Sequence, residues 1–237
     1  MIRIDLSKNC IGYQYVEERK LLEIKMKNQE KLRDSTFEQL FYNSLGMEHF
    51  AIAFGETDRI RELDISENDI GSKNFTLLMK VFRSNTKIST LNVADCRLDG
   101  ECAEELCGIL KEHNESLKLL KFRNSPLGEK GAMAIADLIQ RHPTLVEIEM
   151  FNCEIAELGG NAIGNALKTN FCIEKLSIGD NTLNTKDVEQ IQQSVIFNTQ
   201  YNQMKESNKK FEGFAHNLIA ESLKRWAKQS NFVFDKL

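Results

Sequence analysis

The segment Asp64 to Phe75, with the sequence DISENDIGSKNF, carries residue types that bind calcium. Asp64, Ser66 and Asn68 place oxygen-bearing side chains at its first, third and fifth positions. A calcium loop of the EF-hand type also needs Gly at position six, for a sharp turn, and a bidentate Glu at position twelve. Asp69 and Phe75 stand at these two positions, so the match is weak and the surrounding chain must decide.

Other residue types that perform catalysis are present, but without the spacing that catalysis requires. The six cysteines form no CxxC pair and no cluster with histidine, which argues against zinc and against a disulfide framework. The four histidines have no spacing relation to a nucleophile. The chain has no GxxxxGKS/T phosphate loop, and GEKGAM at 128–133 is a turn into a helix. We therefore predict no catalytic residue, no metal and no cofactor, and we do not expect an enzyme.

The composition is that of a globular protein and excludes several partners. The chain has 237 residues, of which 41% are hydrophobic and 28% charged, with a net charge of -4. This charge gives no general attraction for nucleic acid or for an anionic membrane. No apolar run approaches the roughly eighteen residues of a membrane span, and the first residues lack the basic and apolar regions of a signal peptide. We expect a cytoplasmic protein with protein partners.

One sequence pattern recurs along the chain. It is LxxLxLxxNxL, with Ile, Val, Phe or Met admitted at L, and Cys or Ser admitted at N. Five consecutive copies place the small polar position at intervals of 28, 29, 28 and 28 residues, at Asn68, Cys96, Ser125, Cys153 and Asn181. A sixth copy, MIRIDLSKNCI, opens the chain with Asn9 at this position. A fixed period of this length indicates a solenoid.

These copies resemble the leucine-rich repeat family, in particular the longer helix-containing repeats of the ribonuclease-inhibitor type. The resemblance covers 1–201, interrupted once, and implies an α/β solenoid with a curved parallel sheet on its concave side and helices on its convex side. The residues support this independently, because the LxL core alternates with period two and the intervening segments have helical spacing. One such helical stripe contains Cys102, Leu106, Ile109 and Leu110.

The pattern assigns the small polar position to a structural role. A side chain that points inward after the strand can hydrogen-bond backbone groups that the turn leaves unpaired. This role is predicted for Asn9, Asn68, Cys96, Ser125, Cys153 and Asn181. The same register assigns Ile65 and Ile70 to the core and Asp64 to the concave face. The side chains of the suspected calcium loop therefore point in different directions, and no metal site is expected.

Two segments depart from the repeat. The long interval between Asn9 and Asn68 predicts a charged helical insertion at 13–44, which packs on the solenoid, docks a partner or forms a disordered loop. At 202–237 we expect a C-terminal helical cap or docking segment, because an apolar stripe follows the last repeat at Phe211, Phe214, Leu218, Leu223 and Trp226. The first strand begins at Met1 without a cap, so either the insertion or another chain covers its edge.

The concave face is the candidate binding surface. In each strand, the positions between core residues point to this face. The candidate partner-binding residues are Asp64, Asn92, Lys121, Arg123, Glu149 and Phe151. Arg123 and Phe151 are expected on adjacent strands, about 4.8 Å apart in strand spacing. An aromatic residue beside Arg is typical of interface hot spots, but such a pair also occurs as a simple cation–π contact on a solvated face.

The absence of a catalytic set favours a non-catalytic protein–protein interaction scaffold. By analogy with ciliary members of the resembled family, we expect a subunit of a large cytoskeletal or ciliary (axonemal) assembly. The alternative is a regulator of a small GTPase, because the Ran GTPase-activating protein has similar repeats. A third hypothesis, an actin pointed-end capper related to tropomodulin, would require an actin-binding flank that 13–44 does not provide.

Overall fold

A computed structural model describes residues 2–8, 51, 59–68 and 70–207 of the chain. Asn9, the insertion expected at 13–44 and the segment 208–237 lie outside these described residues. In the described part, six parallel strands form one sheet in the order β1-β2-β3-β4-β5-β6. They are β1 (Ile2–Asp5), β2 (Ile60–Asp64), β3 (Thr90–Asn92), β4 (Leu119–Lys121), β5 (Glu147–Glu149) and β6 (Lys175–Ser177).

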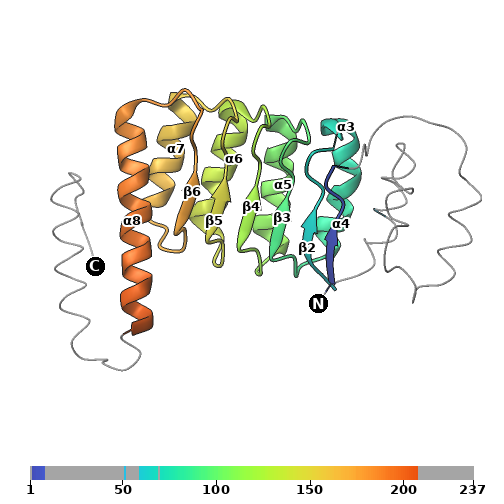
Figure 1. Cartoon of the computed structure of the whole chain (residues 1–237), viewed down its shortest axis with the longest axis horizontal. Coiled ribbons are helices and arrows are strands. Elements are labelled where there is room, and N and C mark those ends of the chain that lie inside the picture. Colours follow the sequence, from blue (N-terminus) through green and yellow to red (C-terminus); the bar gives the residue numbers. More distant parts are fainter. Residues whose placement is uncertain (1, 9–50, 52–58, 69, 208–237) are drawn as a thin grey trace, which may run out of the picture.

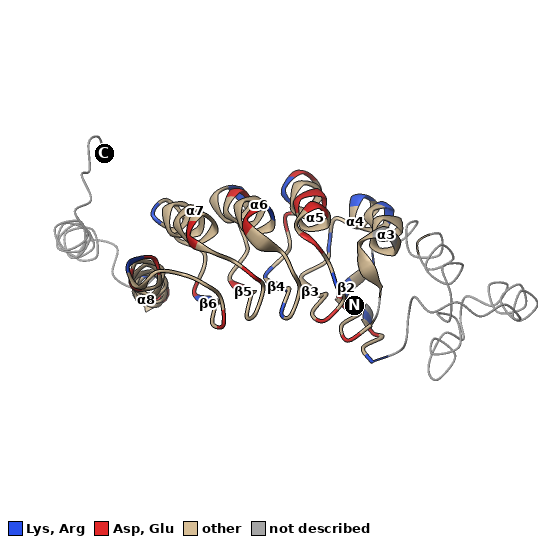
Figure 2. Cartoon of the chain, turned by 90° about the horizontal axis from the view of Figure 1, so that it is seen from above, with Lys and Arg blue, Asp and Glu red and all other residues tan. Residues whose placement is uncertain are grey.

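Helical segments follow the strands from β2 to β6, and all but the last, which lies at the end of the sheet beyond β6, lie together on one side of the sheet (Figures 1 and 2). They are α3 (Gly71–Phe75), the 3-10 helix η1 (Thr76–Leu78), α4 (Met79–Ser84), α5 (Gly100–His113), α6 (Gly128–Arg141), α7 (Glu157–Leu167) and α8 (Thr185–Ser207). From β2 to β5, each unit thus contributes one strand to the sheet and one helical segment or group of segments to the other layer. This arrangement confirms the predicted α/β leucine-rich-repeat solenoid.

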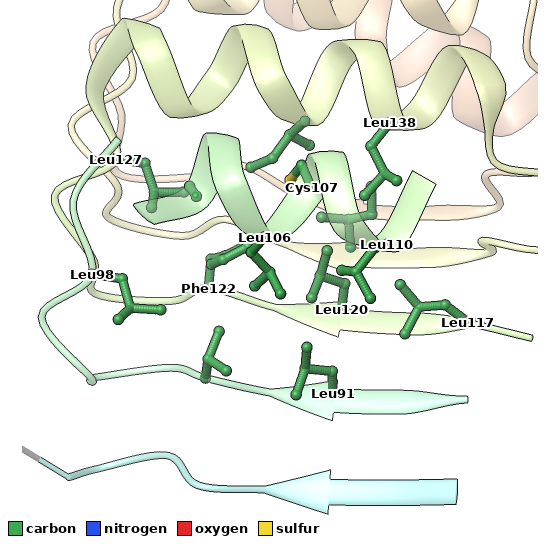
Figure 3. Packing of buried hydrophobic residues seen from close by; sticks show 14 of the residues in the cluster. Leu91, Leu98, Leu106, Cys107, Leu110, Leu117, Leu120, Phe122, Leu127 and Leu138 are labelled. Atoms are coloured by element: carbon green, nitrogen blue, oxygen red, sulfur yellow. The ribbon is translucent and has the colours of Figure 1, made fainter. Parts of the chain in front are cut away.

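From β2 to β6 the strands pair without a shift of the repeat, because equivalent pattern positions lie opposite one another, whereas the pairing of β1 with β2 has one irregularity between Ile2 and Arg3. Leu91 of β3 pairs with Leu63 of β2 and with Leu120 of β4, and Leu120 pairs with Ile148 of β5. These four side chains are fully buried. Figure 3 shows how such strand residues meet helix residues, for example Leu106 and Leu110 of α5, in one continuous core. Burying one aliphatic side chain contributes about 1.5 to 3 kcal/mol.

Each strand is short because the chain turns at a repeated left-handed residue. In every unit the residue before the small polar position has φ between 52° and 62°: Lys8, Glu67, Asp95, Asn124, Asn152 and Asp180. None of them is Gly, although this conformation is costly for other residues. Five of these residues donate their backbone N–H to a carbonyl of the next unit, at 2.8 to 3.0 Å. The strained turn therefore also joins neighbouring units.

The helices pack closely because small residues stand at their first turns. A Cβ atom added at Gly100 would lie 2.4 Å from the Leu127 carbonyl oxygen, and one added at Gly159 would lie 2.5 Å from the Ala132 side chain. Both positions allow the start of a helix to approach the neighbouring unit. Substitution by any larger residue would require the backbones of the two units to separate.

A second row of buried polar residues lies at or just after the ends of α4 to α7 and, in the last unit, within α8. It consists of Asn85, Asn114, His142, Asn170 and Asn198. In the Asn170 side chain, the amide nitrogen donates to the Ile139 carbonyl at 2.7 Å, while the oxygen accepts from two backbone N–H groups. Sequence analysis did not single out this row, although the residues recur every 28 or 29 positions.

Helix α8 differs from the helices that precede it. It has 23 residues, extends beyond β6 in Figure 1 and ends at Ser207. The helix therefore crosses position 201, at which the sequence placed the end of the solenoid. Its buried residues are Asp187, Ile191, Ser194 and Asn198, whereas Ile196 is 55% exposed. One face of α8 thus covers the last unit, and another face carries uncovered apolar side chains.

Candidate functional site

The inward turn positions hold the edge of the concave face in place. The Asn68 amide nitrogen donates to the carbonyl oxygens of Leu6, Ile65 and Ser66 at 2.7 to 2.9 Å, and Asn181 makes the equivalent three bonds in the last unit. The Asn181 side-chain oxygen also accepts from the backbone N–H groups of Cys153 and Ile155. These side chains connect each strand end to the preceding unit.

The two cysteines at the same position are buried and make similar, weaker contacts. The Cys96 Sγ lies 3.1 Å from the Ile65 carbonyl oxygen, and the Cys153 Sγ lies 3.3 Å from that of Phe122. Burial raises the pKa of Cys96 to about 12 and that of Cys153 to about 11. Both thiols are therefore protonated at neutral pH, and a protonated thiol is a poor nucleophile.

Ser125 occupies the same position with a shorter side chain. Its hydroxyl oxygen is buried and has no hydrogen-bond partner among the described residues. The Cys residues of the neighbouring units reach a carbonyl from this position, and Asn reaches three. Ser125 therefore stabilises its turn less than the Asn and Cys residues described at this position, since an unpaired buried hydroxyl lowers the free energy of unfolding.

The first half of the concave face, on β1 to β3, is a network of acidic and small polar side chains. Asp64 accepts hydrogen bonds from the hydroxyl and backbone N–H of Ser66, at 2.6 and 3.0 Å, and from the Asn92 amide at 2.8 Å. Asp5 accepts the same two bonds from Ser7, and these bonds hold the pKa of its carboxyl below the usual value. Asp64 and Asn92 are thus occupied by neighbours in their own chain.

The second half, on β4 to β6, contains charged side chains and one aromatic ring. Lys121 of β4 pairs with Glu149 of β5 at 2.8 Å, and Lys175 of β6 pairs with Glu147 of β5 at 3.2 Å. Within the described residues, the Arg123 guanidinium is exposed and has no hydrogen-bond or ion-pair partner. Most charges of this half are therefore neutralised in pairs, and Arg123 is an exception.

Arg123 and Phe151 lie on neighbouring units, as the register requires. Lys121 is opposite Glu149, and the pairing continues because the Asn124 N–H donates to the Phe151 carbonyl at 3.0 Å. The half-buried Phe151 ring lies over Gly179, where an added Cβ would be 3.2 Å from the ring. The small residue on the next unit therefore leaves room for the ring to lie against the sheet.

A hollow of about 580 Å³ brings these residues together. It is lined by Arg123, Glu147, Ile148, Glu149, Phe151, Lys175, Leu176 and Ser177. Three of the six predicted partner-binding residues thus line one cavity, and Lys121 adjoins it through its ion pair with Glu149. Asp64 and Asn92 lie apart from it in the first-half network. Sequence analysis missed Glu147 and Lys175. Each stands two residues before a residue assigned to the concave face, Glu149 or Ser177, so strand alternation predicts that it faces the same side.

The described residues provide little for other chemistry. They contain no group of three or more His, Cys, Asp or Glu side chains that could hold a metal ion. The segment Asp64 to Phe75 instead forms the end of β2, a turn and helix α3, as the repeat predicts. None of the helices described is long and apolar enough to cross a membrane.

Known proteins with similar sequences are built from the same repeats. The family model described as "Leucine Rich repeat" matches residues 60–73 and 84–107. Ribonuclease inhibitor of Mus musculus is 21% identical over 138 residues, which are 57% of this chain and 30% of that protein. NACHT, LRR and PYD domains-containing protein 12 of Mus musculus is 24% identical over 192 residues, 80% of this chain and 18% of that protein. The chain thus spans less than a third of the length of either relative.

Two solved structures share the fold. A structure titled Leiomodin-1 Actin-Binding Site 2 superposes with a TM-score of 0.60 at 17% identity and covers 76% of this chain and 99% of that one. The tropomodulin C-terminal domain of Caenorhabditis elegans gives a TM-score of 0.57 at 11% identity and covers 70% and 98%. Fold and sequence agree on the class, a solenoid of strand–helix units. The chain is a leucine-rich repeat protein of the ribonuclease-inhibitor-like type.

Proposed function

We propose that this chain is a non-catalytic scaffold that binds a protein partner through the second half of its concave face. The observation that carries the proposal is the exposed Arg123 guanidinium next to the half-buried Phe151 ring, at one hollow of about 580 Å³. Arginine and aromatic residues are enriched at the few positions that dominate binding energy. A solenoid also suits this role, because its concave surface is extended and rigidly built.

The charges around the hollow define the chemistry of the partner. Glu149 and Glu147 are each neutralised by a lysine within 3.2 Å, so Arg123 supplies the net charge of the site. A guanidinium binds carboxylates in a bidentate way. The partner segment that fits this hollow therefore carries an acidic side chain for Arg123 next to an apolar side chain that packs on Phe151.

We place this scaffold in a multi-subunit cytoskeletal assembly, with a ciliary (axonemal) assembly as the more specific hypothesis. The cytoskeletal part is supported by the fold shared with leiomodin and tropomodulin, of which the leiomodin structure is titled as an actin-binding site. Actin is therefore a second candidate, as a direct partner. The hypothesis of a small-GTPase regulator stays a prediction, which a GTP-hydrolysis assay with the purified protein would test.

The experiment compares the partner proteins that the wild type and its variants capture in affinity purification. Tagged wild-type protein, Arg123→Glu and Phe151→Ala are used to purify partners from the native cells, with Lys118→Glu as a control. Lys118 is an exposed residue of the same unit that does not line the hollow. We expect one set of partners to be lost with both site variants and retained with the control. Identical captured sets for all four proteins would refute a concave site in this half.

Actin is tested separately by cosedimentation of the purified protein with actin filaments and by native gels with monomeric actin. Binding that Arg123→Glu weakens would make actin the partner of the concave face. Binding that the variant leaves unchanged would locate the actin contact on another surface. No binding in either assay would remove actin as a candidate while leaving the scaffold proposal to the capture experiment.

A further inference from the structure

The last unit of the solenoid has an apolar groove that the described residues leave uncovered. A hollow of about 570 Å³ lies between β6 with its following turn and helix α8. Its lining includes Leu176, Ile178, Leu183, Val188, Val195 and Ile196. At the strand positions equivalent to Leu176, the inner units have Leu91, Leu120 and Ile148, which are all fully buried. Leu176 itself is only partly buried.

Helix α8 forms one wall of this groove but does not close it. The residues that α8 buries against the body of the solenoid are Asp187, Ile191, Ser194 and Asn198. The groove is lined by Ile191 of this buried face and by the adjoining second face of the same helix, on which Val188, Val195 and Ile196 lie at helical spacing. Ile196 is 55% exposed and Leu183 is half-buried. Two apolar faces on one surface helix indicate a further element that packs against the second face.

We propose that this chain's own C-terminal segment, Phe211 to Trp226, packs along α8 as an antiparallel helix and places Leu223 and Trp226 of its apolar stripe in this groove. The stripe, which at 3.6 residues per turn falls within one half of the circumference of a helix, consists of Phe211, Phe214, Leu218, Leu223 and Trp226. The groove adjoins the hollow that contains Arg123 and shares Leu176 and Ser177 with it, but the inference does not depend on the proposed function, because it rests on the apolar side chains of α8 and of the turn after β6.

The position and length of the segment select it as the occupant. Helix α8 ends at Ser207, beyond the groove, and only 208–210 (Asn-Lys-Lys) separate it from the stripe. Two antiparallel helices are commonly joined by a loop of about two to five residues. At a rise of 1.5 Å per residue, a helix over 211–226 is about 22 Å long, and α8 from Val188 to Ser207 is about 28 Å long. The returning helix is therefore long enough to bring Leu223 and Trp226 beside the groove-lining part of α8, Val188 to Ile196, while the earlier residues of the stripe lie beside the last turns of α8.

The same geometry predicts where the tryptophan lies. In an antiparallel pair closed at 208–210, Phe211 lies beside the last turn of α8, and Trp226 lies near its first half, over the part of the groove lined by Val188 and Gln192. Trp226 is the only tryptophan of the chain. Its fluorescence therefore reports on the groove without contribution from any other residue of this type.

The test measures Trp226 in the full-length protein by emission wavelength and by iodide quenching. The variant is Ile196→Glu, which places a charge in the groove at an exposed position, so the solenoid remains folded by circular dichroism. The matched control is Gln193→Glu, which adds the same charge to α8 at an exposed residue that does not line the groove. We expect blue-shifted, weakly quenched emission in the wild type and the control, and red-shifted emission with several-fold stronger quenching in Ile196→Glu.

Light scattering over a range of concentrations separates the possible occupants. A monomer with protected Trp226 at every concentration supports the segment of the same chain. Two results would overturn the proposal. One is a solvent-exposed Trp226 in the wild type. The other is a dimer whose Trp226 protection falls on dilution, which would assign the groove to a second copy.

Discussion

The two halves of the concave face use the same strand positions in opposite ways. On β1 to β3, the polar side chains bond to one another, so that Asp64 already accepts three hydrogen bonds from Ser66 and Asn92. On β4 to β6, the lysines and glutamates pair, but Arg123 has no partner among the described residues and Phe151 is only half-buried. A position that faces outward in the repeat is therefore not in itself a binding position.

The difference between the halves is one of desolvation. A partner that covers Asp64 gains little binding energy, because this carboxylate already accepts three hydrogen bonds from its own chain and does not need a donor from the partner. A partner that covers Arg123 can offer it a carboxylate, and the apolar ring beside it contributes buried area. We therefore assign the first half to stability and propose recognition for the second, and the following variants separate these two roles.

The largest effect is expected where both halves depend on the same core. Leu91 is fully buried in β3, and Leu91→Asp would bury an unpaired carboxylate in place of an aliphatic side chain. We expect a loss of more than about 4 kcal/mol in unfolding free energy, measured by urea denaturation, because even Leu→Ala at such sites costs about 2 to 5 kcal/mol. The control is Thr90→Asp, one residue earlier on the concave side. Wild-type stability of Leu91→Asp would contradict the strand register.

The comparison itself is tested by one truncation in each half. Asp64→Ala leaves the Ser66 and Asn92 donors without their acceptor, which costs about 1 to 3 kcal/mol of stability. Arg123→Ala removes an exposed side chain and should change stability by less than about 0.5 kcal/mol. Chemical denaturation of both variants measures the difference. Equal losses would mean that the two halves do not differ in this way.

A pH dependence is expected from the second buried row. Burial lowers the pKa of His142, and its Nε2 has no partner among the described residues. A lowered pKa in the folded state means that the unfolded chain binds the proton more tightly. The contribution of His142 to stability is therefore complete above the unfolded pKa of about 6.5 and is lost as the pH falls below it, by up to about 1.4 kcal/mol per pH unit.

The matched variant for this pH effect is His142→Asn, because Asn fills the equivalent position in the other four described units. The unfolding free energy of the wild type should fall from pH 7 to pH 5 more steeply than that of the variant. Parallel pH profiles for the two proteins would exclude His142 as the titrating group.

The smallest effect is a gain. Ser125→Cys would replace an unpaired buried hydroxyl by the thiol that Cys96 and Cys153 place against a carbonyl in the neighbouring units. We expect a stabilisation of about 0.5 to 2 kcal/mol, measured as a higher denaturation midpoint with unchanged slope. Cys96→Ser, the reverse exchange, should lower the midpoint, and the same direction of change for both variants would count against this account of the row.

The sequence was sufficient for the fold because the repeat is regular. A period of 28 or 29 residues determined which leucines face the core, and the register then brought Arg123 beside Phe151. The pairing of the concave charges was not predictable, since Lys121 meets Glu149 only through the rotamers of two long side chains. For the same reason the pattern could not distinguish Asp64, which bonds within its own chain, from Arg123, which does not.

The second buried row and the groove beside α8 could not be predicted from the repeat pattern for a different reason. The second row was visible as spaced Asn residues, but polar residues at the ends of helices usually serve as exposed stops, and only the packed structure shows Asn114 and Asn170 buried. The groove beside α8 lies where the described units end and forms only when β6 and α8 pack together, so it is a property of the assembled solenoid. A repeat pattern describes each unit by its neighbours and is therefore least informative for the last one.

The central claim is that Arg123 recognises a partner and contributes nothing to the fold. Once the partner is isolated, its dissociation constant for the wild type, Arg123→Glu and the Lys118→Glu control tests this claim most directly, with the unfolding free energy measured on the same samples. We predict at least tenfold weaker binding for Arg123→Glu alone, with stability within about 0.5 kcal/mol of the wild type in all three proteins. Equal dissociation constants for the three proteins would contradict the claim.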